Sequence, residues 1–79
     1  MKYKWYYPTY INESHLADKG RFATDNIPAR TAVVETSNPK SLNINESKDY
    51  NLEYVGNNTY VSKTSIAKWE ELTISLNKS

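Results

Sequence analysis

The sequence predicts an all-β domain, and three observations indicate this class. Short runs rich in β-branched and aromatic residues, such as 31–35 and 59–62, are separated by turn residues. No segment repeats its apolar residues with the 3.6-residue period of an amphipathic helix. The chain has 79 residues, which suits a single domain spanning 1–79. We therefore expect at least five short strands and no helix longer than two turns.

Residues 3–11 are expected to form two short strands. Tyr3, Trp5 and Tyr7 alternate along the segment, so their side chains would share one face of a strand. Pro8 has no backbone N–H to donate to a ladder, which predicts an edge strand, a bulge or a break between two short strands. Aromatic side chains fall on both faces, and only one face can meet the core. The sequence therefore predicts a protein-binding surface of Tyr3, Trp5, Tyr6, Tyr7 and Tyr10, with core and cross-strand packing as the alternative.

The next part of the chain is expected to alternate turns and strands. Residues 18–20 form a turn signal, because Gly20 readily adopts positive φ. A brief apolar run, 22–24, precedes a second turn at 25–30, where a proline fixes φ. Residues 31–35 then have the β-branched composition of a strand.

The middle of the chain is polar and is followed by a predicted hairpin. Residues 36–49 are rich in turn formers and are expected to be a solvated loop, although a short helical turn is compatible with them. Residues 50–55 alternate, with two tyrosines and a leucine on one face, as in a half-buried strand. Glycine and two asparagines at 56–58 tolerate positive φ and predict a hairpin turn into a strand at 59–62.

Residues 65–72 contain the one candidate helix, because Ser65 is a good N-cap and helix formers follow it. The apolar stripe of such a helix would consist of little more than Ile66 and Trp69, which is too narrow to bury. We therefore expect a turn here, followed by a strand at 71–76.

Segments 22–27 and 60–66 echo each other in composition. Each has an aromatic strand start, a polar run and an isoleucine, followed by a turn and an apolar strand. This echo predicts two similar hairpin-like units. The expected core consists of Phe22, Ile27, Val33, Leu52, Val61, Ile66, Leu72 and Ile74.

Two patterns in the sequence resemble the first and last parts of a SET domain. The first runs Ser-x-Ile-x-Gly-x-Gly-x-Phe-Ala and then Ile-Pro-x-Gly-Thr, with Asp18 and Arg30 at two of its glycines. The second runs Ile-x-x-Gly-Glu-Glu-Leu-Thr-Ile and is similar to 66–74, with Trp69 at its glycine. The chain thus resembles a degenerate, miniature member of the SET domain and β-clip fold family. The residues in step with the first pattern are Ser14, Leu16, Gly20, Phe22, Ala23, Ile27, Pro28 and Thr31.

The resemblance implies an all-β SET-like β-clip fold and S-adenosylmethionine-dependent methylation of a protein lysine, with Gly20, Arg21 and Phe22 binding the cofactor. The family also uses an Asn-His-Ser-Cys-like motif and a tyrosine after the second pattern, and this sequence has neither. The insert that frames the substrate is too short as well. We therefore expect a non-catalytic binding or assembly module with no cofactor and no catalytic residue. A minimal methyltransferase that binds S-adenosylmethionine is the alternative.

Composition excludes several classes of function. The formal net charge of +1 gives no electrostatic argument for nucleic acid. The absence of cysteine excludes disulfides and thiolate metal sites, and a single histidine excludes a multi-histidine metal cluster. No apolar run approaches the ~20 residues of a membrane span, and no signal peptide is evident, so we expect an intracellular protein.

The expected partner is another protein. A domain this small, without a disulfide or a metal, often needs oligomerisation or unusually good packing to be stable. We expect self-association or a larger assembly, with a well-packed monomer as the alternative. Lysine, asparagine, isoleucine and tyrosine are frequent, as in the AT-rich genomes of phages and some marine bacteria, which bears on the source alone. A virion-associated structural or accessory role is expected from the type of module, because phage proteins are one place where such trimmed modules occur.

Overall fold

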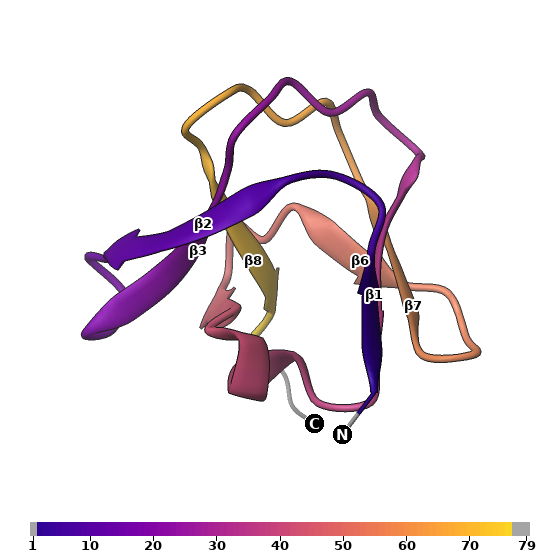
Figure 1. Cartoon of the computed structure of the whole chain (residues 1–79), viewed down its shortest axis with the longest axis horizontal. Coiled ribbons are helices and arrows are strands. Elements are labelled where there is room, and N and C mark those ends of the chain that lie inside the picture. The colour runs from indigo at the N-terminus through magenta and orange to yellow at the C-terminus, as the bar shows by residue number, and fades with distance from the viewer. Residues whose placement is uncertain (1, 77–79) are drawn as a thin grey trace.

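Eight short strands and one 3₁₀ helix form the regular structure of the computed structural model, which describes residues 2–76 (Figure 1). The all-β class is confirmed, as are the minimum of five strands and, for the described residues, the absence of a helix longer than two turns. The strands are β1 (Tyr3–Trp5), β2 (Thr9–Glu13), β3 (Lys19–Ala23), β4 (Ala32–Thr36), β5 (Asn45–Ser47), β6 (Leu52–Tyr54), β7 (Thr59–Ser62) and β8 (Glu71–Ser75), and the helix is η1 (Pro39–Leu42).

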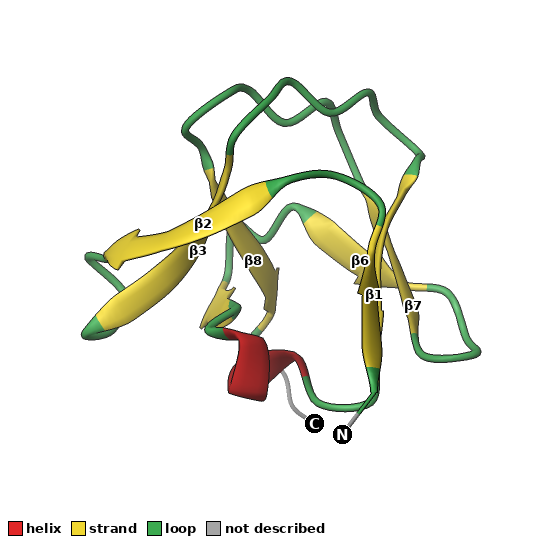
Figure 2. Ribbon diagram, in the orientation of Figure 1, coloured by secondary structure: helices red, strands yellow, loops and turns green. Residues whose placement is uncertain are grey.

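The strands make two four-stranded sheets (Figure 2). The order is β1-β4-β7-β6 in one sheet and β2-β3-β8-β5 in the other. Neighbouring strands are antiparallel, except that β5 runs parallel to β8. The central pairs, β4–β7 and β3–β8, each join a strand from the first half of the chain to one from the second half. Neither half of the chain therefore forms a sheet alone.

Two long loops, 24–31 and 63–70, connect the sheets in opposite directions and cross at one point (Figure 1). There the Ile27 N–H donates to the Ile66 carbonyl at 2.8 Å, and the Ile66 N–H donates back to the Ile27 carbonyl at 2.8 Å. Both isoleucine side chains are buried. This reciprocal pair clips the two loops together over the core.

The segments that echo each other in sequence are related by a pseudo-two-fold axis about this crossing. They are not the hairpin-like units that the echo predicted, because β3 and β4 lie in different sheets, as do β7 and β8. The Arg30 N–H donates to the Ser62 carbonyl at 2.8 Å, and the Trp69 N–H donates to the Ala23 carbonyl at the same distance. These partners are related by the sequence spacing that separates the two isoleucines of the crossing. Arg30 and Trp69 also share a left-handed backbone, with φ of 59° and 76°.

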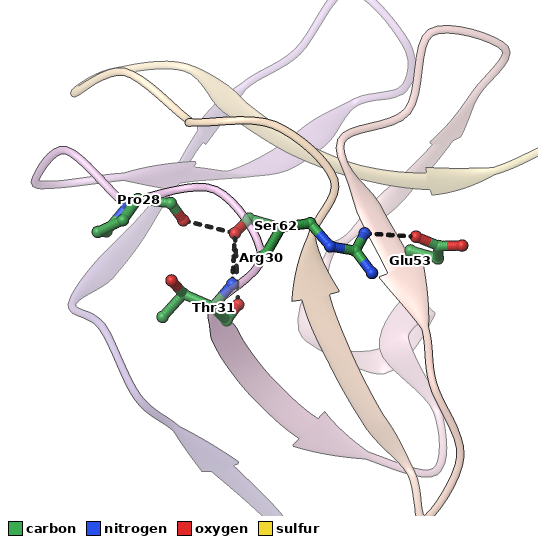
Figure 3. Close-up of polar contacts among 5 residues, drawn as sticks. All are labelled: Pro28, Arg30, Thr31, Glu53 and Ser62. Atoms are coloured by element: carbon green, nitrogen blue, oxygen red, sulfur yellow. Dashed lines mark hydrogen bonds and ion pairs between the residues drawn. The ribbon is translucent and has the colours of Figure 1, made fainter.

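A buried serine fastens the turn that leads into β4 (Figure 3). The Ser62 hydroxyl donates to the Pro28 carbonyl at 2.6 Å and accepts from the Thr31 N–H at 3.1 Å. The side chain has no solvent exposure, so these bonds satisfy a polar group that is costly to bury alone.

The core differs in part from the predicted set. Ile27, Val33, Leu52, Ile66 and Leu72 are buried as expected. Three predictions were wrong: Phe22, Val61 and Ile74 are only half-buried, because other side chains of their strands fill the centre. Four core residues were not predicted, two of them in the polar middle of the chain. The buried cluster is Ala23, Ile27, Val33, Val34, Leu42, Ile44, Leu52, Ile66 and Leu72.

Two predicted loops were also wrong. The turn lies at 15–18 rather than 18–20. Gly20 is a buried residue of β3, and its φ is not positive. Within 36–49, η1 is a short helical turn of the kind that the sequence allows, whereas β5 and the burial of Leu42 and Ile44 contradict a solvated loop. Local composition misses β5 because its pairing partner, β8, lies far along the chain.

The remaining turns are as expected. The hairpin at 56–58 has φ of 99°, 54° and 59° in order. Strands β7 and β8 and the break between β1 and β2 lie where the sequence predicts them. No helix forms at 65–72, as expected.

Candidate functional site

A pocket of about 300 Å³ lies between the two sheets and is walled by tyrosines. Strands β6 and β7 come from one sheet, and β5 and β8 come from the other. Buried Leu52 and half-buried Ile74 give the pocket an apolar part. We call this site the tyrosine pocket; its lining residues are Glu46, Tyr50, Leu52, Glu53, Tyr54, Tyr60, Ile74 and Ser75.

The β6–β7 hairpin sets the angle between two of the rings. Tyr54 and Tyr60 are paired across the strands, and their ring centroids are 5.2 Å apart with an interplanar angle of 53°. The backbone N–H of Asn58, in the hairpin turn, donates to the Tyr54 hydroxyl at 3.2 Å. This bond and the strand register hold the two rings as a corner rather than as a flat stack.

The third ring, that of Tyr50, already contacts a cation of the chain. The Lys63 ammonium nitrogen lies 3.8 Å from the Tyr50 ring centroid. Tyrosine faces attract cations because the ring quadrupole is negative there. The same attraction is available from Tyr54 and Tyr60, which line the pocket with it.

Two glutamates are among the lining residues. Glu46 lies opposite Ile74 in the β5–β8 register, whereas Glu53 alternates with Tyr54 along β6, so its side chain projects from the other face of that strand. Glu53 pairs with Arg30 at 2.9 Å (Figure 3), and Glu46 pairs with Lys40 at 3.5 Å. Both ion pairs are substantially exposed, so each contributes only about 0–1 kcal/mol and is readily exchanged. Burial raises the pKa of Tyr60, and the neighbouring Tyr54 adds to the shift. Tyr60 therefore remains a neutral phenol at physiological pH.

The three predicted cofactor residues, Gly20, Arg21 and Phe22, lie together on β3, and each contacts other residues of the chain. A Cβ atom built on Gly20 would stand 2.3 Å from Glu71 Oε2, so a carboxylate covers this backbone. The Ser14 hydroxyl donates to both Glu71 oxygens at 2.9 and 2.8 Å, and Asn45 Nδ2 donates to Oε2 at 2.9 Å. The expected open turn for backbone approach to a ligand is thus a strand beneath a hydrogen-bonded glutamate.

Arg21 and Phe22 are also engaged. Arg21 Nε donates to the Leu42 carbonyl at 2.9 Å, and its guanidinium lies 4.9 Å from the Trp5 ring centroid. Burial lowers the pKa of Arg21. The Phe22 ring packs against Tyr10, with centroids 5.6 Å apart.

The five aromatic residues of the predicted protein-binding surface divide into three groups. Trp5 and Tyr7 pack against the core, as the alternative of core packing expects. Tyr3 is 56% exposed and Tyr6 is 40% exposed, and the Tyr6 hydroxyl donates to Glu35. That carboxylate raises the pKa of Tyr6.

Tyr10 belongs to a separate aromatic cluster. It contacts Phe22 on one side and packs edge-on against Trp69 on the other, at 5.7 Å between centroids. Trp69 is 56% exposed, and Lys68 lies 4.9 Å from its ring centroid. The structure thus places the predicted residues in three different environments.

Comparison of the chain with protein-family models, with curated proteins and with solved structures gives no match. Within residues 2–76, no three histidine, cysteine or acidic side chains gather as metal ligands would. The described part of the chain also contains no helix with the length and apolarity needed to span a membrane.

Sequence reasoning missed the tyrosine pocket. Alternation at 50–55 does place Tyr50 and Tyr54 on one face of a strand, but it does not indicate what they face. Glu46 joins them only because β5 docks on β8, a pairing between segments far apart in the sequence.

Proposed function

We propose that this chain is a non-catalytic, SET-like binding module that holds a protein partner at the tyrosine pocket. The single observation that carries the proposal is a corner of tyrosine rings on paired strands, with an apolar part and carboxylates beside it. Tyrosines are enriched at the energetic centres of protein interfaces, because they combine a large apolar ring with a polar end.

Two backbone positions support the SET-like β-clip assignment. Arg30 and Trp69 stand where the two family patterns have glycine, and both have the positive φ that glycine adopts most readily. The reciprocal Ile27–Ile66 pair also joins the two units whose sequences echo each other, as expected of a fold built from two similar units.

The Gly20 environment favours a binding module over the alternative, a minimal methyltransferase. A cofactor that approaches this backbone would have to displace Glu71 from Ser14 and Asn45. Calorimetric titration of the protein with S-adenosylmethionine tests the point. We expect no heat of binding; saturable one-to-one binding would favour the methyltransferase instead.

Self-assembly through β1 is a second candidate function. β1 is the outer strand of its sheet, and exposed Tyr3 lies on it. Beside it is a groove of about 500 Å³ that Tyr3 lines together with Lys2 and Lys4. An edge strand of this kind can pair with a strand of a second chain.

Sedimentation at micromolar concentration tests self-assembly. Deleting 1–7 would remove a paired strand and two core-packing rings, so the informative variant is Tyr3→Ser with Tyr6→Ser. We expect the parent to sediment as an oligomer and the double variant as a monomer. A monomeric parent would exclude self-assembly through β1.

A further inference from the structure

We infer that the tyrosine pocket binds the guanidinium group of an arginine side chain carried by the partner protein. This inference rests on the proposed binding function and names the chemistry of its ligand. Three independent features of the tyrosine pocket support arginine binding: the arrangement of its rings, the charge of its lining and its apolar part.

The ring arrangement suits a flat cation. Tyr54 and Tyr60 meet at 53°, so a planar group that stacks on one ring presents its edge toward the other. Guanidinium stacks on aromatic faces and is more weakly hydrated than ammonium, which lowers the cost of entering an apolar site. The apolar stem of the arginine would contact Ile74 and the aromatic walls.

The charge of the lining suits the same group. Glu46 lines the tyrosine pocket opposite Ile74, and no lysine or arginine is among the described residues that line it. Guanidinium carries five N–H donors in a fixed plane, so it can stack on a ring while donating to a carboxylate at its edge.

Two contacts of these kinds already occur beside the pocket: one joins a guanidinium group to a carboxylate, and the other joins a cation to a tyrosine ring. Arg30 donates to Glu53 at 2.9 Å, and the Lys63 ammonium lies on the Tyr50 ring. Each is a single contact made by an exposed or half-buried side chain at the edge of the site. An arginine inside the pocket would combine a ring contact of this kind with a carboxylate contact to Glu46, which lies opposite the pocket residue Ile74.

Titration of ¹⁵N-labelled protein with three short peptides tests the inference by NMR. The peptides are blocked Gly-Xaa-Gly tripeptides in which Xaa is arginine, lysine or citrulline, the last being a neutral analogue of arginine. We expect saturable shifts at the amides of Tyr54, Tyr60 and Ile74 with the arginine peptide, and an affinity on the order of millimolar. Citrulline should bind about tenfold more weakly, because it loses the charge-assisted bonds, and lysine should bind several-fold more weakly.

Two variants and two matched controls locate the site. Tyr54→Ala and Glu46→Gln should each weaken arginine binding by about fivefold or more. Ile11→Ala is the control for the first, because Ile11 is an apolar side chain of similar exposure, 46% against 54% for Tyr54, on a strand of the other sheet. Glu13→Gln is the control for the second, since Glu13 is an exposed carboxylate on another strand. Glu46→Gln preserves side-chain shape, so it remains informative if Tyr54→Ala does not fold.

Several outcomes would overturn the inference. Equal binding of the arginine and citrulline peptides would exclude recognition of charge, and equal binding of arginine and lysine would exclude selection of a planar cation. Shifts confined to amides outside the pocket would exclude the site. Citrulline binding at the pocket amides with the same affinity as arginine would retain a protein-binding site there and reject only its cationic ligand. The proposed function fails separately, by saturable binding of S-adenosylmethionine.

Discussion

Two non-glycine residues hold equivalent turns of this protein in the left-handed conformation. Arg30 and Trp69 have φ of 59° and 76°, and the backbone N–H of each bonds to the strand from which the other loop departs. Side chains with a Cβ adopt this conformation at a cost of roughly 1–2 kcal/mol. The surrounding hydrogen bonds therefore hold a conformation that these residue types disfavour.

Glycine at position 30 should stabilise the fold. Arg30→Gly removes the left-handed cost but makes the unfolded chain more flexible, for a net gain of about 0.5–1 kcal/mol. Arg30→Ala is the matched control, because it loses the same ion pair with Glu53 and keeps the Cβ. Urea unfolding of the three proteins measures the difference. A glycine variant no more stable than the alanine variant would contradict the strain argument.

A methyl group at Gly20 should destabilise the protein. Its Cβ would meet Glu71 Oε2 at 2.3 Å and Ser14 Cβ at 2.9 Å, so both side chains must shift. We expect Gly20→Ala to cost about 1–3 kcal/mol, as for other overpacked sites. In a double-mutant cycle with Glu71→Ala the cost should fall, since one clash is gone. An unchanged cost would show that the carboxylate does not limit the space.

Tyr60 should make stability sensitive to alkaline pH. Burial raises its pKa in the folded state, so the folded protein holds this proton above the pH at which the unfolded chain releases it. The corresponding stability is present below about pH 10 and is lost as pH rises through the raised pKa. Denaturation at increasing pH should show a smaller loss for Tyr60→Phe than for the parent. Equal losses would contradict a role for this phenol.

At the scale of elements, the β3–β8 pair separates core from surface. In its register Arg21 lies opposite Leu72, and Phe22 lies opposite Glu71. Leu72 is fully buried, whereas Phe22 is half-buried and packs against Tyr10. Side chains alternate between the two faces of a strand. The Phe22 ring, which belongs to the first SET-like pattern, therefore lies in the aromatic cluster with Tyr10 and not in the core.

Truncation of these two residues should have unequal effects. Leu72→Ala leaves a cavity in the core and should cost about 2–5 kcal/mol. Phe22→Ala should cost clearly less, because solvent can fill part of the space. Chemical denaturation of both variants measures the comparison. A larger loss for Phe22→Ala would place that ring, and not Leu72, at the centre of packing.

At the scale of the whole molecule, each sheet contains strands from both halves of the chain. The first half supplies β4 to a sheet that also holds β7, and the second half supplies β8 to a sheet that also holds β3. The two loops are then clipped at Ile27 and Ile66. Neither sheet can be lost without exposing the shared core.

Unfolding should therefore be a single cooperative transition. Trp5 lies in one sheet, and Trp69 packs on Tyr10 of the other. Fluorescence of Trp69→Phe reports on the first sheet, and fluorescence of Trp5→Phe reports on the second. In each variant the fluorescence midpoint should coincide with that from far-ultraviolet circular dichroism. Separate midpoints within one variant would show that the sheets unfold independently.

The sequence by itself determined the all-β class, most strand positions and the internal echo. These features depend on local chemistry, such as Pro8 between two strands and left-handed residues at 56–58. Only the tertiary structure decided that β5 pairs with β8, that Gly20 lies beneath Glu71, and that three tyrosines and two glutamates share a pocket. The physical reason is that pairing of distant strands brings these groups together, and alternation within one segment carries no information about its partner.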